Sequence, residues 1–382
     1  AAQAEAWRAE GLLAQDHLPA IYPYSQTFSL YGSSQIYERR GLICLVRLDD
    51  EGTAAPQLLP HEDVIEPSLA ARLALLEATG LAGQPTHGIY DDPARTLEPL
   101  LEPYLRRPLV QATDGQGVRS ALGVLQHAGE IEFLQNFFSG KPILIADGHH
   151  RLETSRRLRN RFLAAHPDAP ATHPARYHLM FLSNAAADGL RILPTHRLVT
   201  LPEGFDGDAF YAAASAYFDI RPLDARMPIY LEMQGRRRAF GVIWQDRQHL
   251  FTLKPDIDPV AAIPLPLPAS VRALDYTALH YFLLDRALGL PYARQHEAPE
   301  LAYTKDLGTA LARAGADPSL MAIIANEVGL HELRAVAQDH ARMPPKSTYF
   351  YPKVLGGLLF AQHLPELQPE HDAASALGSR FR

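Results

Sequence analysis

The amino-acid sequence predicts an α+β fold, and three observations lead to this class. Apolar runs typical of strands recur between segments with helical spacing, but their order is not the regular alternation of a βαβ array. Two strand pairs are joined by short polar turns at 31–34 and 114–117, which is typical of hairpins. Two proline-rich segments, 167–174 and 254–268, then interrupt the chain.

The proline-rich segments divide the 382 residues into three regions, in keeping with a prior of ~150 residues per domain. We expect residues 1–168 to form a first α+β domain and residues 175–260 to form a middle α+β region. Residues 268–382 are expected to form a mixed, helix-rich C-terminal region that packs on the site of the first domain.

Hydrophobic spacing and turn residues place the elements of each region. The first region is expected to contain, in order, a helix over 2–13, strands over 21–28 and 35–48, a helix from 67, a strand over 87–90, strands over 108–113 and 118–125, a helix over 127–138, a strand over 142–146 and a helix directly after it. The later regions are expected to contain strands over 176–182 and 191–199, a helix over 205–218, a hairpin over 239–253, a helix from 275, a strand over 320–325, a helix over 331–340 and an extended segment over 343–353.

The composition argues against nucleic acid and membranes as partners. Lys and Arg number 36 against 43 Asp and Glu, which gives a net charge of −7, and a dedicated DNA-binding protein would show a stronger basic footprint. The apolar runs stay short of the ~18 residues that a membrane span needs. The single cysteine, Cys44, lies in an apolar run, so no disulfide can form within the chain and we expect a reducing, cytoplasmic location.

The stretch from Pro142 to Thr154 carries the main functional signal. A short buried strand ends at Asp147-Gly148, where Asp147 is a natural helix N-cap, and the helix then opens with His149, His150 and Arg151. Helix N-termini prefer acidic residues because their backbone N–H groups carry partial positive charge. Cationic donors at such an end favour a bound anion, above all phosphate, provided that they reach solvent. The alternative is structural, with the two imidazoles neutral and Arg151 paired with a carboxylate.

Four other groups of polar residues are weaker candidates. Arg40 precedes a buried run and is expected to project at a strand end. His61-Glu62 lacks the second histidine of the zinc-protease motif, because Ile65 stands there, and by itself indicates a solvated loop. His196-Arg197 is a second cationic pair that we expect to be exposed near a strand. The segment with Lys346-Ser347 suits either phosphate contact or a tyrosine-rich packing strap, since two prolines hold it extended.

Six motifs occur in the order in which they occur in one prokaryotic family. They are Tyr22-x-Tyr24, Arg40-Gly41, His61-Glu62, Ile145–Arg151 with Glu153-Thr154, Pro194–Arg197 and Pro344–Phe350. Through them nearly the whole chain resembles a large family of proteins of unknown function (DUF1015), related to the ParB/sulfiredoxin superfamily. Ala-Asp-Gly-His-His-Arg is its most specific element. Members usually carry a further N-terminal segment with Pro-Pro-Tyr-Asp-Val, so we expect the present chain to begin inside the full protein.

The resemblance implies a ParB/sulfiredoxin-like nucleotide-binding domain and a phosphotransferase activity. In SerK-type free serine kinases of this superfamily, a motif like Asp147–Arg151 binds polyphosphate and a carboxylate earlier in the chain acts on the substrate hydroxyl. Glu62 is the position that matches this carboxylate. The implied reaction is phosphoryl transfer from ATP or ADP to the hydroxyl of a small metabolite, with free L-serine, which would give O-phosphoserine, as the first candidate.

The resemblance also implies roles for individual residues. Glu62, Asp147 and His150 would be the catalytic groups, and Asp147 would orient the phosphates or help to hold Mg²⁺. The phosphate-binding set would be Gly148, His149, His150, Arg151 and Thr154. The substrate-binding set would be Arg40, His196, Arg197, Lys346 and Ser347, if the lobes close over one cleft. The sequence leaves the oligomeric state open.

Two rival functions stay open at this point. ParB relatives use the same loop to bind a nucleotide and change partners, so the chain also suits a nucleotide-binding regulatory switch without small-molecule kinase activity. A metal hydrolase that uses His149, His150 and Glu153 is the third reading, although their spacing fits no ligand motif known to us. Bound nucleotide with formation of phosphoserine would separate the kinase from both.

Overall fold

The computed structural model describes residues 2–30, 34–224, 226–344 and 346–364. Its backbone contacts divide the chain into two units. Unit 1 consists of Ala1–Leu58, Val64–Gly189 and Pro352–Arg382, and unit 2 consists of Leu59–Asp63 and Leu190–Tyr351. Each unit has its own sheets and helices.

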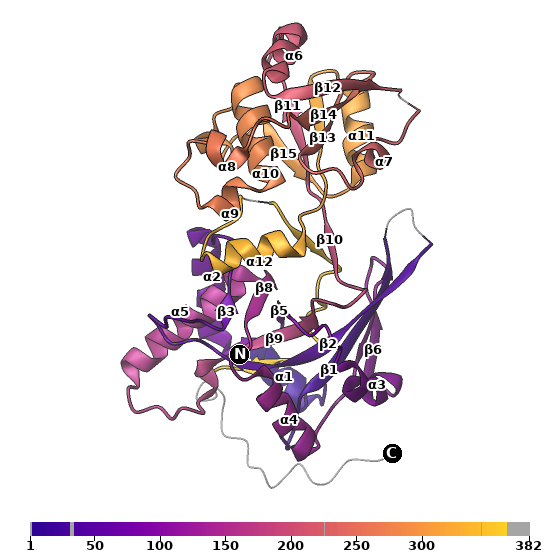
Figure 1. Cartoon of the computed structure of the whole chain (residues 1–382). Coiled ribbons are helices and arrows are strands. Elements are labelled where there is room, and N and C mark those ends of the chain that lie inside the picture. The colour runs from indigo at the N-terminus through magenta and orange to yellow at the C-terminus, as the bar shows by residue number, and fades with distance from the viewer. Residues whose placement is uncertain (1, 31–33, 225, 345, 365–382) are drawn as a thin grey trace. The chain divides into compact units, whose positions relative to one another are not determined.

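Unit 1 is built on an eight-stranded sheet with the strand order β3-β8-β5-β9-β2-β1-β7-β6 (Figure 1). Its strands are β1 (Tyr22–Ser29), β2 (Ile36–Arg47), β3 (Leu58–Leu59), β5 (Thr86–Tyr90), β6 (Val110–Thr113), β7 (Arg119–Leu122), β8 (Ile143–Asp147) and β9 (Tyr177–Asn184). In the centre of the sheet β5 runs parallel to β9, whereas β8 is antiparallel to β5. This register sets His87 opposite both Asp147 and Phe181, so the end of β8 lies beside the middle of the sheet.

The helices of unit 1 follow the hydrophobic spacing of the sequence. They are α1 (Ala2–Ala9), α2 (Glu66–Thr79), α3 (Glu98–Arg106), α4 (Ala128–Phe138) and α5 (His149–Ala165), with the short 3₁₀ helix η1 (Pro174–Arg176). A two-stranded sheet joins β4 (Leu81–Ala82) to β18 (Ala361–Gln362) near the end of the chain.

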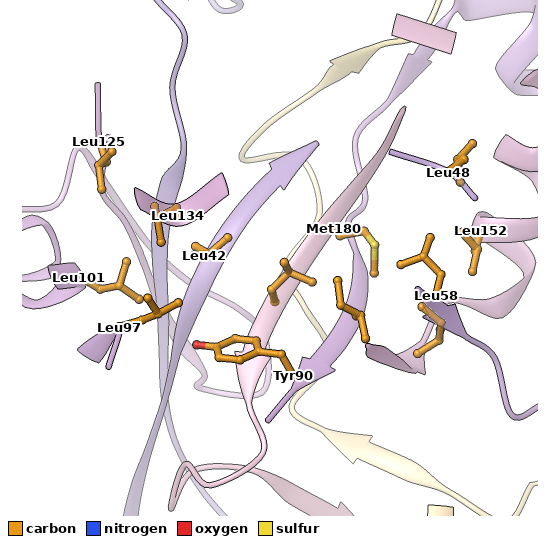
Figure 2. Close-up of a cluster of buried hydrophobic side chains, with 13 residues drawn as sticks. Leu42, Leu48, Leu58, Tyr90, Leu97, Leu101, Leu125, Leu134, Leu152 and Met180 are labelled. Atoms are coloured by element: carbon orange, nitrogen blue, oxygen red, sulfur yellow. The ribbon is translucent and has the colours of Figure 1, made fainter. Parts of the chain in front are cut away.

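Successive residues of a strand point to opposite sides of the sheet. Apolar residues occupy both sides of the large sheet, and each side packs against other parts of unit 1. On one face Leu42 and Met180 from the strands pack with Leu101, Leu134 and Leu152 from α3, α4 and α5 (Figure 2). Full burial of each such side chain contributes about 1.5–3 kcal/mol.

The other face of the same sheet has a second apolar cluster. There Ile43 and Phe181, the strand neighbours of Leu42 and Met180, pack with Tyr24. Val354 and Ala361 join this cluster from the C-terminal segment. The last described segment of the chain therefore packs on this second face of the sheet.

Unit 2 is built on a six-stranded antiparallel sheet with the order β12-β14-β13-β16-β11-β15, and a two-stranded sheet joins β10 to β17. Its strands are β10 (Arg191–Leu193), β11 (His196–Thr200), β12 (Phe218–Leu223), β13 (Ala239–Trp244), β14 (Arg247–Leu253), β15 (Leu301–Thr304), β16 (Leu320–Ile324) and β17 (Tyr349–Tyr351). Its helices are α6 (Gly207–Ser215), α7 (Ile229–Met233), α8 (Pro259–Ala262), α9 (Ala269–Arg272), α10 (Asp275–Ala278), the π-helix η2 (Leu279–Ala287), η3 (Tyr292–Arg294), α11 (Leu307–Ala316) and α12 (Leu330–Gln338).

The α+β class is confirmed, since each unit combines mainly antiparallel sheets with helices. The division differs from the three expected regions. Strand β9, which was expected to open the middle region, lies in the centre of the unit 1 sheet between β5 and β2. Strand β16 pairs with β13 and β11, so the expected middle and C-terminal regions share one sheet. Strand pairing is non-local, and a proline-rich segment marks only a loop.

Many local elements of the sequence prediction agree with the structure, but the single strand expected over 191–199 is wrong. Two strands, β10 and β11, lie there and belong to different sheets. The strand and helix expected on either side of Gly148 are β8 and α5, and the expected hairpin over 108–125 is the antiparallel pair β6–β7. Strands β1 and β2 also pair antiparallel as expected, although three of the four residues of their predicted turn, 31–33, lie outside the described part of the chain. None of the described helices is long and apolar enough to cross a bilayer.

Candidate functional site

The candidate site lies where β8 passes into α5, and Gly148 makes the turn between them. Gly148 is the N-cap residue of α5 and has φ = 97°, a left-handed conformation that side chains other than glycine rarely adopt. A Cβ atom at this position would lie 2.6 Å from Arg151 Nη2 and 2.8 Å from Thr86 Oγ1. The strand-to-helix turn therefore requires glycine at position 148 for two reasons. The backbone is left-handed there, and a Cβ atom would collide with neighbouring side chains.

The prediction that Asp147 caps α5 is wrong. The cap residue is Gly148, which makes no side-chain cap bond. The Asp147 carboxylate instead lies between two cations. Its Oδ2 accepts from Arg151 Nη2 at 3.0 Å, and its Oδ1 accepts from Lys353 Nζ. Two charge-assisted hydrogen bonds to cations thus take the place of the single bond to the backbone that a capping carboxylate would make.

The two cations keep Asp147 ionised. Burial alone would raise the pKa of its carboxyl, but Lys353 and Arg151 outweigh burial and hold the pKa below the ordinary value. Arg151 is itself largely enclosed, with 18% of its side chain exposed, and it also donates to the carbonyl oxygen of Pro85 at 3.2 Å. Its Nε is buried and has no hydrogen-bond partner among the described residues.

The two histidines of the motif have different surroundings. His149 is buried, with 5% of the residue exposed. His150 is partly exposed, and its Nε2 accepts from the backbone N–H of Ile65 at 2.9 Å, so this nitrogen carries no proton. The His150 carbonyl accepts from the Thr154 hydroxyl at 2.7 Å, and that hydroxyl is buried. His150 and Arg151 thus keep access to solvent, whereas His149 and Thr154 belong to the packed base of the turn.

A buried polar network supports the turn from the sheet. His178 contacts the hydroxyls of Thr86 at 2.7 Å and Ser155 at 2.8 Å, and His87 contacts Ser183 Oγ at 2.7 Å. Burial, followed by nearby cations, lowers the pKa of both imidazoles well below the usual value, so both are neutral. Because these hydrogen bonds fix β5, β9 and α5 to one another, the geometry of Gly148 and Arg151 is rigidly supported.

Sequence reasoning missed Lys353, Thr86 and His87, all of which lie at this site. Lys353 falls at the end of the extended segment 343–353, in which Lys346 and Ser347 were singled out instead. Thr86 and His87 precede a glycine in a buried strand, where polar residues need buried partners. Two polar residues inside a strand that is otherwise apolar were therefore a usable signal for a buried polar network. No signal in the sequence indicated that Lys353, which is 206 residues from Asp147, would contact it.

Arg40, a predicted substrate-binding residue of unit 1, lies apart from this turn. It forms an ion pair with Glu38, with Nη2 2.8 Å from Oε2, and a second pair with Glu102 on α3. Its strand neighbour Arg39 faces the opposite side of the sheet, where it donates to Gln26 and to the carbonyl oxygen of Pro352.

Glu62 and the remaining predicted substrate-binding residues belong to unit 2. Glu62 is partly buried and follows His61, whose Nε2 lies 3.4 Å from Thr348 Oγ1 and whose carbonyl accepts from Met343 N at 2.8 Å. Within unit 2, Glu62 is thus tied to the segment that carries Lys346 and Ser347. Lys346 is exposed, whereas the Ser347 hydroxyl is buried and donates to the Pro344 carbonyl at 2.7 Å.

The expectation that His196 and Arg197 are exposed is wrong. His196 is 3% exposed and Arg197 is fully buried on β11, an inner strand of the unit 2 sheet. Burial and Arg197 lower the pKa of His196 to about 4. The Arg197 guanidinium donates to His280 Nε2 at 2.8 Å and stacks 4.3 Å from the centre of the Tyr276 ring. Strand β11 lies between β16 and β15 in the interior of the sheet. The dipeptide His-Arg by itself does not reveal that its strand is an inner one.

The site suits anions better than a metal ion. Both oxygens of Asp147 are already engaged by cations, the opposite of what a cation ligand needs. In the described part of the chain, no group of three or more His, Cys, Asp or Glu side chains is arranged to hold a metal, and Glu153 pairs with Arg157 at 3.2 Å. The surroundings of Asp147 therefore do not suit Mg²⁺.

Comparison with solved structures finds remote similarities. A free serine kinase in complex with AMP matches with a TM-score of 0.38 and 12% identity, covering 81% of this chain and 86% of that chain. The protein SbnI from Staphylococcus aureus, with a C-terminal truncation, matches with a TM-score of 0.42 and 10% identity, covering 86% and 90%. A conserved hypothetical protein from Pyrococcus furiosus matches with a TM-score of 0.37 and 12% identity, covering 82% and 94%. Similarity at this level carries no argument about function.

Comparison with sequences gives the family. No protein of curated function matches the sequence. The sequence pattern of one family, described as proteins of unknown function (DUF1015), matches residues 1–277 of the 382, which is well over half of the chain. By this match, the chain belongs to the DUF1015 family.

Proposed function

We propose that unit 1 binds the phosphates of a nucleotide at the β8–α5 turn and that the protein is a small-molecule kinase. The observation that carries the proposal is the preassembled cationic site around Asp147. Arg151 and Lys353 are both held in place by this carboxylate, and the first turn of α5 contributes N–H groups and no acidic residue. A helix N-terminus with fixed cations is the common arrangement for phosphate groups.

In the proposed reaction, the acceptor hydroxyl attacks the terminal phosphorus of the nucleotide. The new P–O bond forms as the bond to the leaving phosphate breaks, so that ATP gives ADP or ADP gives AMP. The N–H groups of α5 and Arg151 stabilise the charge on the phosphate oxygens, and this stabilisation is the main task in such reactions. Asp147 acts as their internal counter-ion and keeps the Arg151 guanidinium in one orientation.

Glu62 is the proposed base that accepts the proton of the attacking hydroxyl. Free L-serine is the proposed first acceptor and O-phosphoserine the product. Arg40, His196, Arg197, Lys346 and Ser347 are the proposed substrate-binding residues. For the two buried residues of β11, His196 and Arg197, the proposal now requires an indirect role, since their side chains are already enclosed within unit 2.

The test is incubation with ATP or ADP and L-serine, followed by mass spectrometry for O-phosphoserine. We expect product from the wild type and none from Arg151→Ala. Arg161→Ala, a variant of an exposed arginine on the same helix, is the matched control and should behave as the wild type. Nucleotide binding or hydrolysis without phosphoserine would contradict the serine kinase and favour a regulatory switch.

A further inference from the structure

The segment Pro352–Leu355 is held across the sheet of unit 1 by three side chains of β1 and β2. Arg39 donates to the Pro352 carbonyl, and Gln26 Nε2 donates to the Lys353 carbonyl at 2.9 Å. The backbone N–H of Leu355 lies 3.3 Å from the Tyr24 hydroxyl, which acts as its acceptor. The backbone on both sides of Lys353 is therefore fixed, and its side chain extends from this fixed backbone to Asp147.

Arg39 is an unusual anchor, because it is a fully buried guanidinium with unmet hydrogen-bonding capacity. It bonds to Gln26 Oε1 and the Pro352 carbonyl and lies 5.4 Å from the centre of the Phe181 ring, but its Nε and Nη1 have no partner among the described residues. No ion pair joins it to a carboxylate in the described part of the chain. Burial of such a group costs several kcal/mol, which points to a role other than stability.

The charges around the site leave a positive excess. The buried ring of His87 interacts with three cations, Arg39, Lys353 and Arg151, and with one carboxylate, Asp147. Three positive charges and one negative charge give a net charge of +2 on these four groups. Because Arg39 is fully buried and Arg151 is largely enclosed, this excess is unfavourable by itself and is compensated when an anion with two or more charges binds.

We infer that Lys353, which lies 206 residues from Asp147 in the sequence, is a direct phosphate ligand of the β8–α5 site. Arg39 is the positioning residue that holds the Pro352–Leu355 segment in place. This inference rests on the proposed function and adds to it a ligand outside the Asp147–Arg151 motif. The ligand class is a polyphosphate, such as the diphosphate portion of a nucleotide. On binding, the Lys353 ammonium group would donate to phosphate oxygens as well as to Asp147.

The test is calorimetric titration of the full chain with inorganic pyrophosphate in metal-free buffer. Lys353→Ala should weaken binding by at least about tenfold, because a charged hydrogen bond is lost, and Lys353→Arg should recover most of the affinity. Lys141→Ala is the matched control, since Lys141 is a lysine of the same unit that lies over the Phe137 ring, and its affinity should equal that of the wild type. Unchanged binding in Lys353→Ala, or no binding by the wild type, would overturn the inference.

A double-mutant cycle tests the positioning role of Arg39. Arg39→Met should weaken pyrophosphate binding several-fold in the wild type but have little further effect in the Lys353→Ala background, because it acts through Lys353. Equal effects in both backgrounds would refute that role. Gln26→Met, which removes the neighbouring anchor, replaces Arg39→Met if the latter does not fold. A chain that binds pyrophosphate through Lys353 but forms no phosphoserine would refute the kinase and leave this inference intact.

Discussion

Asp147 and Arg151 form an ion pair across the first turn of α5, with Arg151 Nη2 3.0 Å from Asp147 Oδ2. Both side chains are largely enclosed, at 24% and 18% exposure, so solvent screens this pair much less than a surface pair. The pair turns a motif that looks unfavourable in sequence, a helix start rich in cations, into a stable structure. It also leaves the buried Arg151 Nε without a hydrogen-bond partner among the described residues.

Asp147→Asn should destabilise the protein, because Arg151 and Lys353 then lose their shared counter-ion. We expect a loss of about 2–4 kcal/mol in the free energy of unfolding, as for other partly buried ion pairs that lose one partner. Urea denaturation at pH 7 measures it. Asp50→Asn, which affects an exposed pair with Arg47, is the control and should cost below about 1 kcal/mol. Equal losses in the two variants would show that the enclosed pair has no special weight.

Gly148→Ala should damage both stability and phosphate binding. The added Cβ would meet Arg151 Nη2 and Thr86 Oγ1 at under 3 Å, and the backbone has φ = 97°. Gly140→Ala is a matched control, because Gly140 also has positive φ, at 68°, but open space around it. The control should lose only about 1 kcal/mol from the left-handed backbone. A larger loss in Gly148→Ala, together with weaker pyrophosphate binding, is the expected result, and equal behaviour of both variants would contradict it.

Glu62→Gln tests the proposed base. We expect phosphoserine formation to fall by about 10²–10⁴-fold, the usual contribution of general-base catalysis, while the nucleotide dissociation constant stays the same. The neighbouring Asp63→Asn, which alters an exposed carboxylate, should retain activity. Steady-state kinetics and calorimetry together make the measurement. A Glu62→Gln enzyme with wild-type kcat would remove Glu62 from the mechanism.

Stability should fall between pH 6.5 and pH 4 because of His196. Its folded pKa of about 4 lies below the ordinary value of 6.5, since burial and Arg197 disfavour the charged ring, whereas Asp306 acts weakly in the opposite direction. The unfolded chain therefore binds the proton first, so this stability is fully present above pH 6.5 and is lost as the pH falls toward 4.

The size of this effect is on the order of 3 kcal/mol, from the shift between the two states. The free energy of unfolding, measured by urea titration at several values between pH 7 and pH 4.5, should decline less steeply in His196→Gln than in the wild type. Parallel pH profiles for the two proteins would contradict the assignment.

The local part of the fold was predictable, and the long-range part was not. Strand β8, the turn at Gly148 and helix α5 follow from neighbouring residues alone. The partners of Asp147 do not, because Lys353 arrives through the packing of the last described segment. The neighbouring residues Arg39 and Arg40 on β2 also show that long-range contacts cannot be predicted from local sequence. Alternation implies that Arg39 and Arg40 face opposite sides, but only the sheet order reveals that Arg39 is on the side of Lys353.

The most direct test of the phosphate site is calorimetric titration of ADP into the wild type, Arg151→Ala and Arg161→Ala. The structure predicts binding by the wild type, a loss of at least about tenfold in affinity for Arg151→Ala and no change for Arg161→Ala. A folded Arg151→Ala protein that binds ADP as tightly as the wild type would contradict the assignment of the β8–α5 turn.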